Sequence, residues 1–211
     1  TQSDLDNHAT QQGANVGDCL YKDVSGPDGK PDGKIDAYDQ VVLGSGLPKV
    51  NFGLSARLEY KNFDLTVSSY GALNYHVSDD IYNSLNSCYG WGNKDVSILN
   101  ANQYSDDGKT YISSVPRTYV TNNASLAWND LFSSRKIQNA AYWKIANIEL
   151  GYNLPNKWFK GIISGARAYI SAQNVYTFTG YHGYNVDYAG GTFTPGNNFC
   201  SFPTTHTYMC G

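Results

Sequence analysis

The sequence predicts an all-β fold of long antiparallel strands, and three observations predict it. Aromatic residues make up 14% of the 211 residues, 18 of them Tyr, and such residues favour strands. Gly is abundant, at 21, whereas charged residues reach only 16%, below the roughly 25% of an ordinary soluble domain. Four stretches alternate apolar and polar side chains with the period of two that a strand with unlike faces requires.

The first two alternating stretches predict a β-hairpin over residues 51–73. On one face of the first strand fall Phe52, Leu54, Ala56, Leu58 and Tyr60. Lys61 and Asn62 make a tight turn, after which apolar and polar residues alternate again from Phe63. Residues 1–50, which precede this hairpin, are predicted to be a polar segment on the loop side.

Two further strands are predicted within residues 142–178, joined by a short linker. Pro155 ends the first of them, because proline cannot donate to a strand ladder. Between the two strand pairs, residues 74–141 show no alternation and are predicted to be a long loop. Residues 179–206 form a second predicted loop, and a last strand starts within 207–211.

The lengths of these segments favour a transmembrane β-barrel. Strands of about 9–11 residues, with short turns on one side and long external loops on the other, suit a bilayer. Lipid satisfies no backbone hydrogen bond, so a spanning sheet must close, and five strands cannot close it. We therefore expect the C-terminal antiparallel strands of a large barrel, within a longer polypeptide. The alternative is a secreted β-sandwich that binds glycans and is stiffened by calcium.

The polar faces of the predicted strands supply the candidate lumen residues. In a barrel, apolar side chains face lipid and the alternate positions face the interior. The positions that this rule assigns to the lumen are Arg57, Glu59, Asn147, Glu149, Arg167 and Gln173.

An Asp/Gly cluster at residues 28–39 is similar to an EF-hand-type calcium loop. Such a loop needs oxygen ligands at fixed positions and Gly at the sixth, which Gly33 supplies. Lys30 falls at a ligand position that it cannot fill. The candidate ligands are Asp23, Asp28, Asp32, the Lys34 carbonyl, Asp36 and Asp39. A calcium ion here would order an external loop; the alternative is an Asp/Gly turn without metal.

Aromatic residues in the two long loops are candidate contacts for a substrate or a partner. Their rings combine an apolar face with a polar rim, which suits sugars and protein surfaces alike. The candidates are Tyr89, Trp91, Tyr181, Tyr184 and Tyr188. Alternatively, these rings pack the loops against each other or mark the membrane interface.

Enzymatic and nucleic-acid-binding functions find no support in the sequence. The formal net charge of −3 gives no general reason to expect nucleic acid. The sequence has no nucleophile elbow, phosphate loop or dinucleotide fingerprint, and its four His are not spaced as metal ligands. We therefore predict that the protein is not an enzyme.

Seven blocks, in order, resemble the C-terminal part of the SusC/RagA-like family of TonB-dependent outer-membrane transporters. Each block is short, but their order and spacing agree with the family over nearly the whole sequence. The blocks are Gly17–Val24, Pro31–Gly44, Pro48–Leu65, Asp80–Asn83, Pro116–Arg117, Ala141–Pro155 and Gln173–Thr179, with Thr207–Tyr208 at the end.

This resemblance implies a multi-pass protein of the bacterial outer membrane that imports a nutrient, either an oligosaccharide or a peptide. It also implies a SusD-type surface lipoprotein as a lid, and a TonB complex acting through a plug that these residues do not include. The family usually ends in a full strand with a terminal aromatic residue, whereas this sequence stops at Gly211.

Overall fold

A computed structural model describes the chain over residues 1–90, 92–119, 128–159, 165–187 and 191–211. The chain divides into two compact units. We call residues 1–43 and 81–136 the loop unit, and residues 44–80 and 137–211 the sheet unit.

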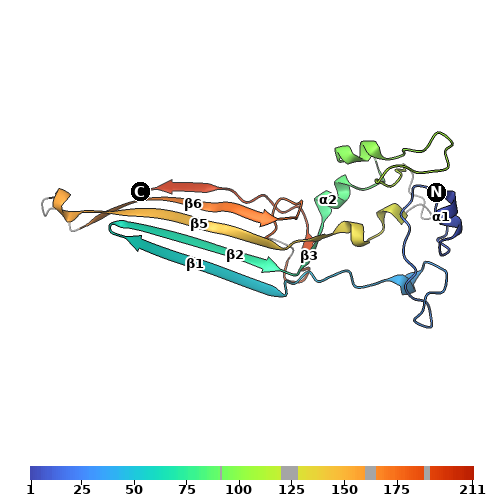
Figure 1. Cartoon of the computed structure of the whole chain (residues 1–211), viewed down its shortest axis with the longest axis horizontal. Helices are drawn as coiled ribbons and strands as arrows, with labels where there is room; N and C mark the ends of the chain where they lie inside the picture. The colour runs from blue at the N-terminus through green and yellow to red at the C-terminus, as the bar shows by residue number, and fades with distance from the viewer. Residues whose placement is uncertain (91, 120–127, 160–164, 188–190) are drawn as a thin grey trace. The chain divides into compact units, whose positions relative to one another are not determined.

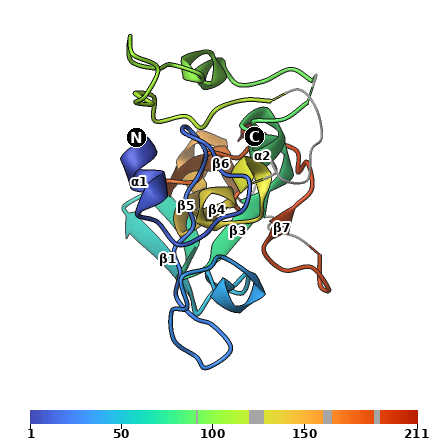
Figure 2. The same ribbon diagram turned by 90° about the vertical axis from the view of Figure 1, so that its right-hand side faces the viewer.

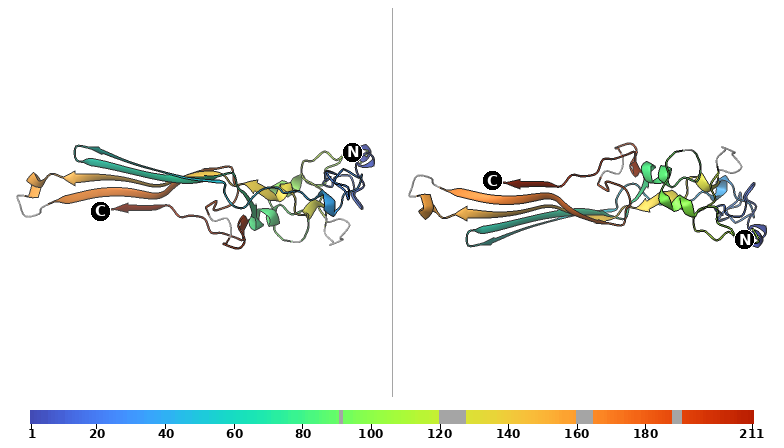
Figure 3. Two further views of the ribbon diagram at one scale, coloured as in Figure 1. Left: turned by 90° about the horizontal axis from the view of Figure 1, so that it is seen from below. Right: turned by 90° about the horizontal axis from the view of Figure 1, so that it is seen from above.

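The sheet unit is built on one long antiparallel sheet (Figure 1). Its strand order is β1-β2-β5-β6-β8, and Figure 3 shows the long strands running side by side as one twisted layer. The strands are β1 (Val50–Tyr60), β2 (Phe63–Leu73), β5 (Tyr142–Leu154), β6 (Ala166–Thr179) and β8 (Thr207–Cys210). The sheet is open, with β1 and β8 as its two edges.

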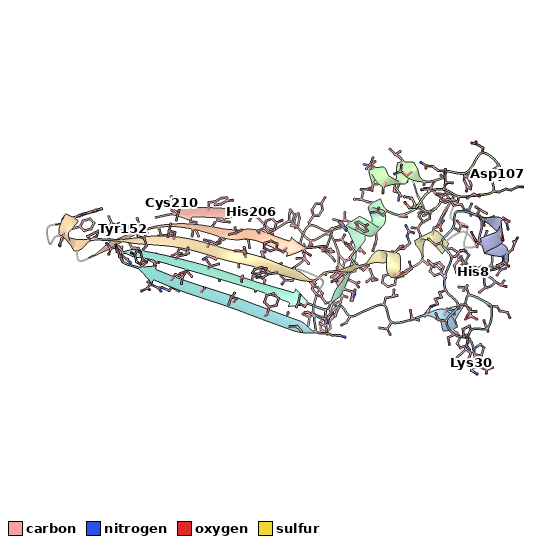
Figure 4. The ribbon with its side chains drawn as sticks, viewed as in Figure 1. His8, Lys30, Asp107, Tyr152, His206 and Cys210 are labelled. Atoms are coloured by element: carbon pink, nitrogen blue, oxygen red, sulfur yellow. The ribbon has the colours of Figure 1, made fainter. Side chains whose placement is uncertain are left out.

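The two ends of the long sheet differ in their connections. At one end, Lys61 and Asn62 join β1 to β2, and Lys61 adopts the positive φ of 55° that such a tight turn requires. At the same end, the 3-10 helix η5 (Asn156–Phe159) follows β5, and Tyr152 lies close by (Figure 4). We call this the hairpin end and the opposite one the loop end.

A second, three-stranded sheet occupies segments that the sequence predicted to be loops. Its strands are β3 (His76–Asp79), β4 (Ile137–Asn139) and β7 (Asn197–Asn198), in the order β4-β3-β7. β3 pairs antiparallel with β4 and parallel with β7. Strands of two to four residues are too short to show an alternating pattern, so sequence periodicity could not reveal them.

A small apolar core lies in the sheet unit at the loop end. It consists of Ala72, Tyr75, Val77, Ala140, Tyr181 and Val186, with Tyr142 packed against it. Each of the six is at most 6% exposed. Most apolar side chains of the long strands are not part of this core, because they lie exposed on the sheet.

The loop unit contains short helices joined by irregular segments (Figure 2). They are α1 (Gln2–Asp6), η1 (Ala37–Asp39), most of α2 (Asp80–Leu85), η2 (Val96–Asn100) and η4 (Ser134–Lys136). Of the helices described here, none is both long and apolar enough to cross a membrane.

Candidate functional site

The strand register gathers the aliphatic side chains onto one face of the long sheet. Residues paired across neighbouring strands share a face. One such row is Leu58, Leu65, Leu150, Ile170 and Cys210, and the next is Ala56, Val67, Ile148, Ala172 and Tyr208. Several members are widely exposed, among them Leu58 at 66% and Ile170 at 60%. In water this band would be an unusually large apolar patch.

Aromatic side chains border this aliphatic band at both ends. At the loop end, Phe52, Trp143 and Phe178 lie in one row across the sheet, and the Trp143 and Phe178 rings stack at 5.3 Å. At the hairpin end, Phe63 pairs with Tyr60 and Tyr152, and its ring lies 4.7 Å from the Tyr152 ring. We call these two groups the aromatic belts.

The spacing of the belts can be compared with the thickness of a membrane. Phe52 and Tyr60 are eight residues apart on β1, which is about 27 Å along a strand. At the 35–45° tilt usual in barrels, this corresponds to a height of roughly 19–22 Å, close to the ~25 Å apolar band of outer-membrane barrels.

The opposite face of the sheet is polar and carries the six residues predicted to face a lumen. Arg57 and Glu149 lie in one row, Asn147 and Gln173 in the next, and Glu59 pairs with Asp64. Arg167 of β6 completes the set, because it pairs with Asn153 of β5 and paired residues share a face. The structure therefore brings all six onto one face; that this face borders a lumen stays a prediction.

Arg167 ties three strands together on the polar face. Its guanidinium donates to both carboxylate oxygens of Asp64, at 3.1 and 2.5 Å, and to Glu149 at 2.7 Å. To reach Asp64 on β2, the side chain crosses β5 over Gly151, where an added Cβ would lie 2.3 Å from the Arg167 Nη2 atom. The glycine is therefore needed for this crossing.

Lys144 is a polar-face residue that the alternation pattern misplaced. Counting back from Asn147 by twos puts Lys144 on the apolar face. In the structure, Ser68 pairs with Asn147 but Ser69 pairs with Ile145, so Ala146 is an extra residue in a β-bulge. The bulge reverses the alternation and turns Lys144 to the polar face. A one-residue bulge leaves no mark in composition, so the sequence offered no signal for it.

Lys144 is buried, and its charge is balanced. Its side chain is 2% exposed, and the Nζ atom lies 2.6 Å from Asp187 Oδ2. The hydroxyl of Tyr70, its neighbour on β2, donates to the same carboxylate oxygen at 2.8 Å. A buried ammonium is stable only when paired in this way.

The aromatic candidates differ in how far they are available to a ligand. Tyr184 is 63% exposed. Tyr89 is half-buried and stacks on Tyr119 at 5.5 Å. Tyr181 is 6% exposed and its hydroxyl donates to Asp79, which favours the packing alternative, while its role as a contact stays a prediction. Trp91 and Tyr188 lie outside the described residues.

The carboxylates of the Asp/Gly loop accept main-chain hydrogen bonds. Asp39 accepts from the amides of Val24 and Ser25 through Oδ1 and from the Asp36 amide through Oδ2. These amides, that of Asp36 foremost, lower the pKa of Asp39. Lys30 lies at the outer bend of this loop (Figure 4).

The remaining candidate ligands of the loop are similarly engaged or open to solvent. Asp23 accepts from the Gly33 amide at 2.7 Å and Asp32 from the Lys34 amide at 3.0 Å, while Asp28 is exposed. In the described ranges, no group of three or more His, Cys, Asp or Glu side chains is arranged to hold a metal ion. Calcium at this loop therefore stays a prediction.

Two of the family-like sequence blocks meet in the loop unit. Asp18, whose side chain is fully buried, accepts from Arg117 at 2.5 and 2.9 Å and from the Asn129 amide group at 2.8 Å. The Arg117 amide also donates to the Gly17 carbonyl at 2.9 Å. The blocks around residues 17 and 117 thus form one polar centre of this unit.

A sheet with an exposed aliphatic face, two aromatic belts and a polar, ion-paired opposite face defines a class of protein: part of the wall of a membrane β-barrel. Such a wall separates lipid from a polar interior, and its backbone groups are satisfied by neighbouring strands.

Comparisons with known proteins agree with this class. The chain is 27% identical over 200 residues to TonB-dependent receptor P3 of Formosa agariphila, covering 91% of the chain. It is 26% identical over 206 residues to TonB-dependent receptor SusC of Bacteroides thetaiotaomicron. In both cases the chain spans 18% of the relative's length. No family model matches the chain.

Solved structures give the same result. The match to the RagAB peptide importer in its open-open state covers 96% of this chain and 21% of the importer chain, with a TM-score of 0.69 and 25% identity. The match to its closed-closed state covers 88% of this chain and 19% of the importer chain, with a TM-score of 0.66 and 26% identity. By sequence and by fold, the chain is similar to one segment of a SusC/RagA-like TonB-dependent receptor, and the predicted fold class is confirmed.

Proposed function

We propose that this chain forms part of the wall of a bacterial outer-membrane importer and crosses the membrane several times. The observation that supports this most directly is the pair of unlike faces on the long sheet. The aliphatic band between the aromatic belts would face lipid, and the face carrying Arg57, Glu149 and Arg167 would line the passage.

The proposed cargo is a nutrient, either a peptide or an oligosaccharide. RagAB is a peptide importer, which supports the first class. The exposed Tyr184 ring suits either class, because an aromatic face stacks on sugars and on apolar side chains alike. As in the resemblance to SusC/RagA-like transporters, the proposed partners are a SusD-type lipoprotein lid and a TonB complex that acts on a plug outside these residues.

A blot of outer membranes tests the membrane assignment. An antibody to residues 94–110 should detect the native gene product in the outer-membrane fraction, as a band that shifts on boiling because folded barrels resist detergent. A soluble, unshifted band at 23.2 kDa would contradict it and favour the secreted β-sandwich.

The assignment of faces is tested by two arginine substitutions in the full-length protein. Leu150→Arg should oppose barrel insertion by roughly 2–4 kcal/mol, because it would place a charge in lipid. Asn147→Arg, on the polar face of the same strand, should cost much less. The folded fraction of each variant is read from the boiling shift, and equal losses would show that the faces are wrongly assigned.

A further inference from the structure

Residues 181–187, which we call the strap, fold back onto the polar face of the long sheet at its loop end. Asp187 binds Lys144 of β5 at 2.6 Å and Tyr70 of β2 at 2.8 Å, both from polar-face positions. One residue earlier, the Val186 carbonyl accepts from the Tyr75 hydroxyl at 2.7 Å. This end of the strap is therefore attached at two points to the polar face of the sheet and at a third to Tyr75, which lies between β2 and β3.

The other end of the strap is attached to the small sheet. The Tyr181 hydroxyl lies in a buried group with Asp79 of β3 and Asn198 of β7, and Asn198 donates to that hydroxyl at 2.7 Å. Tyr181 and Val186 also belong to the small apolar core. Between these attachments, Tyr184 stands 63% exposed. The strap is thus held at both ends, the His182 amide next to Tyr181 also donates to the Gln138 side chain at 3.0 Å, and the Tyr184 side chain is exposed.

Burying Lys144 under this strap has a physical cost that needs a reason. Some polar-face side chains, such as Arg57 and Glu59 at 66% and 63% exposure, keep their charges in water. Lys144 is covered, and a buried ammonium is tolerated only with a close counter-ion. Asp187 supplies it from the strap itself, so displacing the strap would leave a charge without its partner.

We propose that the Lys144–Asp187 ion pair keeps the strap across the polar face as a size-limiting constriction of the passage, with Tyr184 presented at its open side. The inference rests on the proposed function, because the strap can narrow a passage only if the polar face borders one. Lys144 and Asp187 are positioning residues in this proposal: they hold the strap and do not contact the cargo.

The test measures access of water-soluble reagents to the polar face in the full-length protein in whole cells. Gln173→Cys places a thiol on the polar face, and Ala172→Cys places one on the apolar face next to it. Each variant is treated with a small, charged thiosulfonate and with a polyethylene glycol maleimide of about 5 kDa. A narrow water-filled passage admits only the small reagent, whereas a wide one admits both. Labelling is quantified on the Cys-containing peptides, so the native cysteines do not interfere.

With the ion pair intact, Gln173→Cys should react with the small reagent and hardly with the large one. Adding Asp187→Asn should raise the rate with the large reagent at least about tenfold while the small reagent changes little, since removing one buried partner releases the strap. Tyr70→Phe removes only a neutral donor and should produce a smaller rise. The exchanged pair Lys144→Asp with Asp187→Lys should restore exclusion.

The outcomes separate this inference from the proposed function. If Asp187→Asn leaves the large reagent excluded as before, the strap is not held by the ion pair and the inference is wrong. If Ala172→Cys reacts with the charged reagent as fast as Gln173→Cys, the apolar face does not meet lipid and the proposed function fails. Should Asp187→Asn not assemble, hydrogen exchange of residues 181–187 in the unaltered protein decides: exchange at the rate of an unfolded peptide would overturn the inference.

Discussion

Asp18 and Arg117 show, at the scale of single residues, how two distant sequence blocks meet in the folded chain. The Asp18 side chain is fully buried and accepts hydrogen bonds from Arg117, from the Asn129 side chain and from the Asn15 backbone amide. A buried carboxylate is stable only when protein donors replace the hydrogen bonds that it has lost from water. The sequence predicted both blocks as parts of a resemblance, but not that they touch, because residues 99 positions apart carry no local signal of contact.

Arg117→Ala should therefore strongly destabilise the loop unit. The substitution leaves the Asp18 carboxylate buried without its counter-ion, at a cost of about 3–5 kcal/mol. Hydrogen exchange in the full-length protein should show faster exchange for residues 1–43 and 81–136 and little change in the long sheet. Asn15→Ala is the control, because Asn15 donates to Asp18 only through its backbone amide, which alanine keeps. Comparable losses in both variants would contradict the role of the ion pair.

The cysteines give a second prediction at this scale, because all four are free thiols. Cys88 is 2% exposed, and burial raises its pKa, whereas Cys200 is exposed. A raised pKa leaves less reactive thiolate at pH 8, so iodoacetamide should modify Cys200 at least about tenfold faster than Cys88. The difference should narrow as the pH rises. Mass spectrometry of the alkylated peptides measures both rates, and equal rates for Cys88 and Cys200 at pH 8 would refute this prediction.

At the scale of elements, the long strands follow from the sequence and the short ones do not. Alternation over ten residues predicts β1, and the structure has β1 at Val50–Tyr60. The small sheet depends on pairing between residues as distant as Ser78 and Asn197, which periodicity cannot detect. Tyr181 shows the same limit for the site: a loop tyrosine has the same sequence signature whether it is buried or exposed.

The crossing of Arg167 over β5 gives a prediction for the sheet. Gly151→Ala should push the guanidinium away from Asp64 and lower the free energy of unfolding by about 1–3 kcal/mol, as expected for losing charged hydrogen bonds. Gly53→Ala is a matched control on the same face, because its new Cβ would meet only the Ser69 carbonyl oxygen, at 3.9 Å. Thermal unfolding of the purified full-length protein measures both. A larger loss in Gly53→Ala would reject this account.

At the scale of the whole molecule, the chain places its apolar surface outside and its small core on the polar side. Most aliphatic side chains of β1 are exposed, whereas Tyr75, Val77 and Ala140 are buried near the polar face. In water this arrangement is unfavourable, but it suits a wall with lipid on one side. The composition predicted the strands, whereas the apolar face was predicted from the alternation of side chains and the lengths of the segments.

Expressed alone, the 211-residue chain should associate unless detergent is present. Every residue of β1 is exposed, and the outer edge of this strand offers unpaired backbone groups to another chain. Sedimentation without detergent should show species much larger than 23.2 kDa, and detergent should reduce them. A soluble monomer in plain buffer would instead support the secreted β-sandwich.

The bulge at Ala146 makes the pairing register of β5 matter more than the chemistry of that position. Ala146 is the residue without a partner on β2, so substitutions there should be well tolerated. If β5 instead paired straight through Ala146, without the bulge, the residues before it would shift by one position against β2, and Lys144 would exchange sides with Trp143 and Ile145. A charge would then meet lipid and two apolar side chains would meet water. Deleting Ala146 would only remove the bulge and keep both faces, so sequence variation at this point is expected to show many substitutions and also the loss of this one residue.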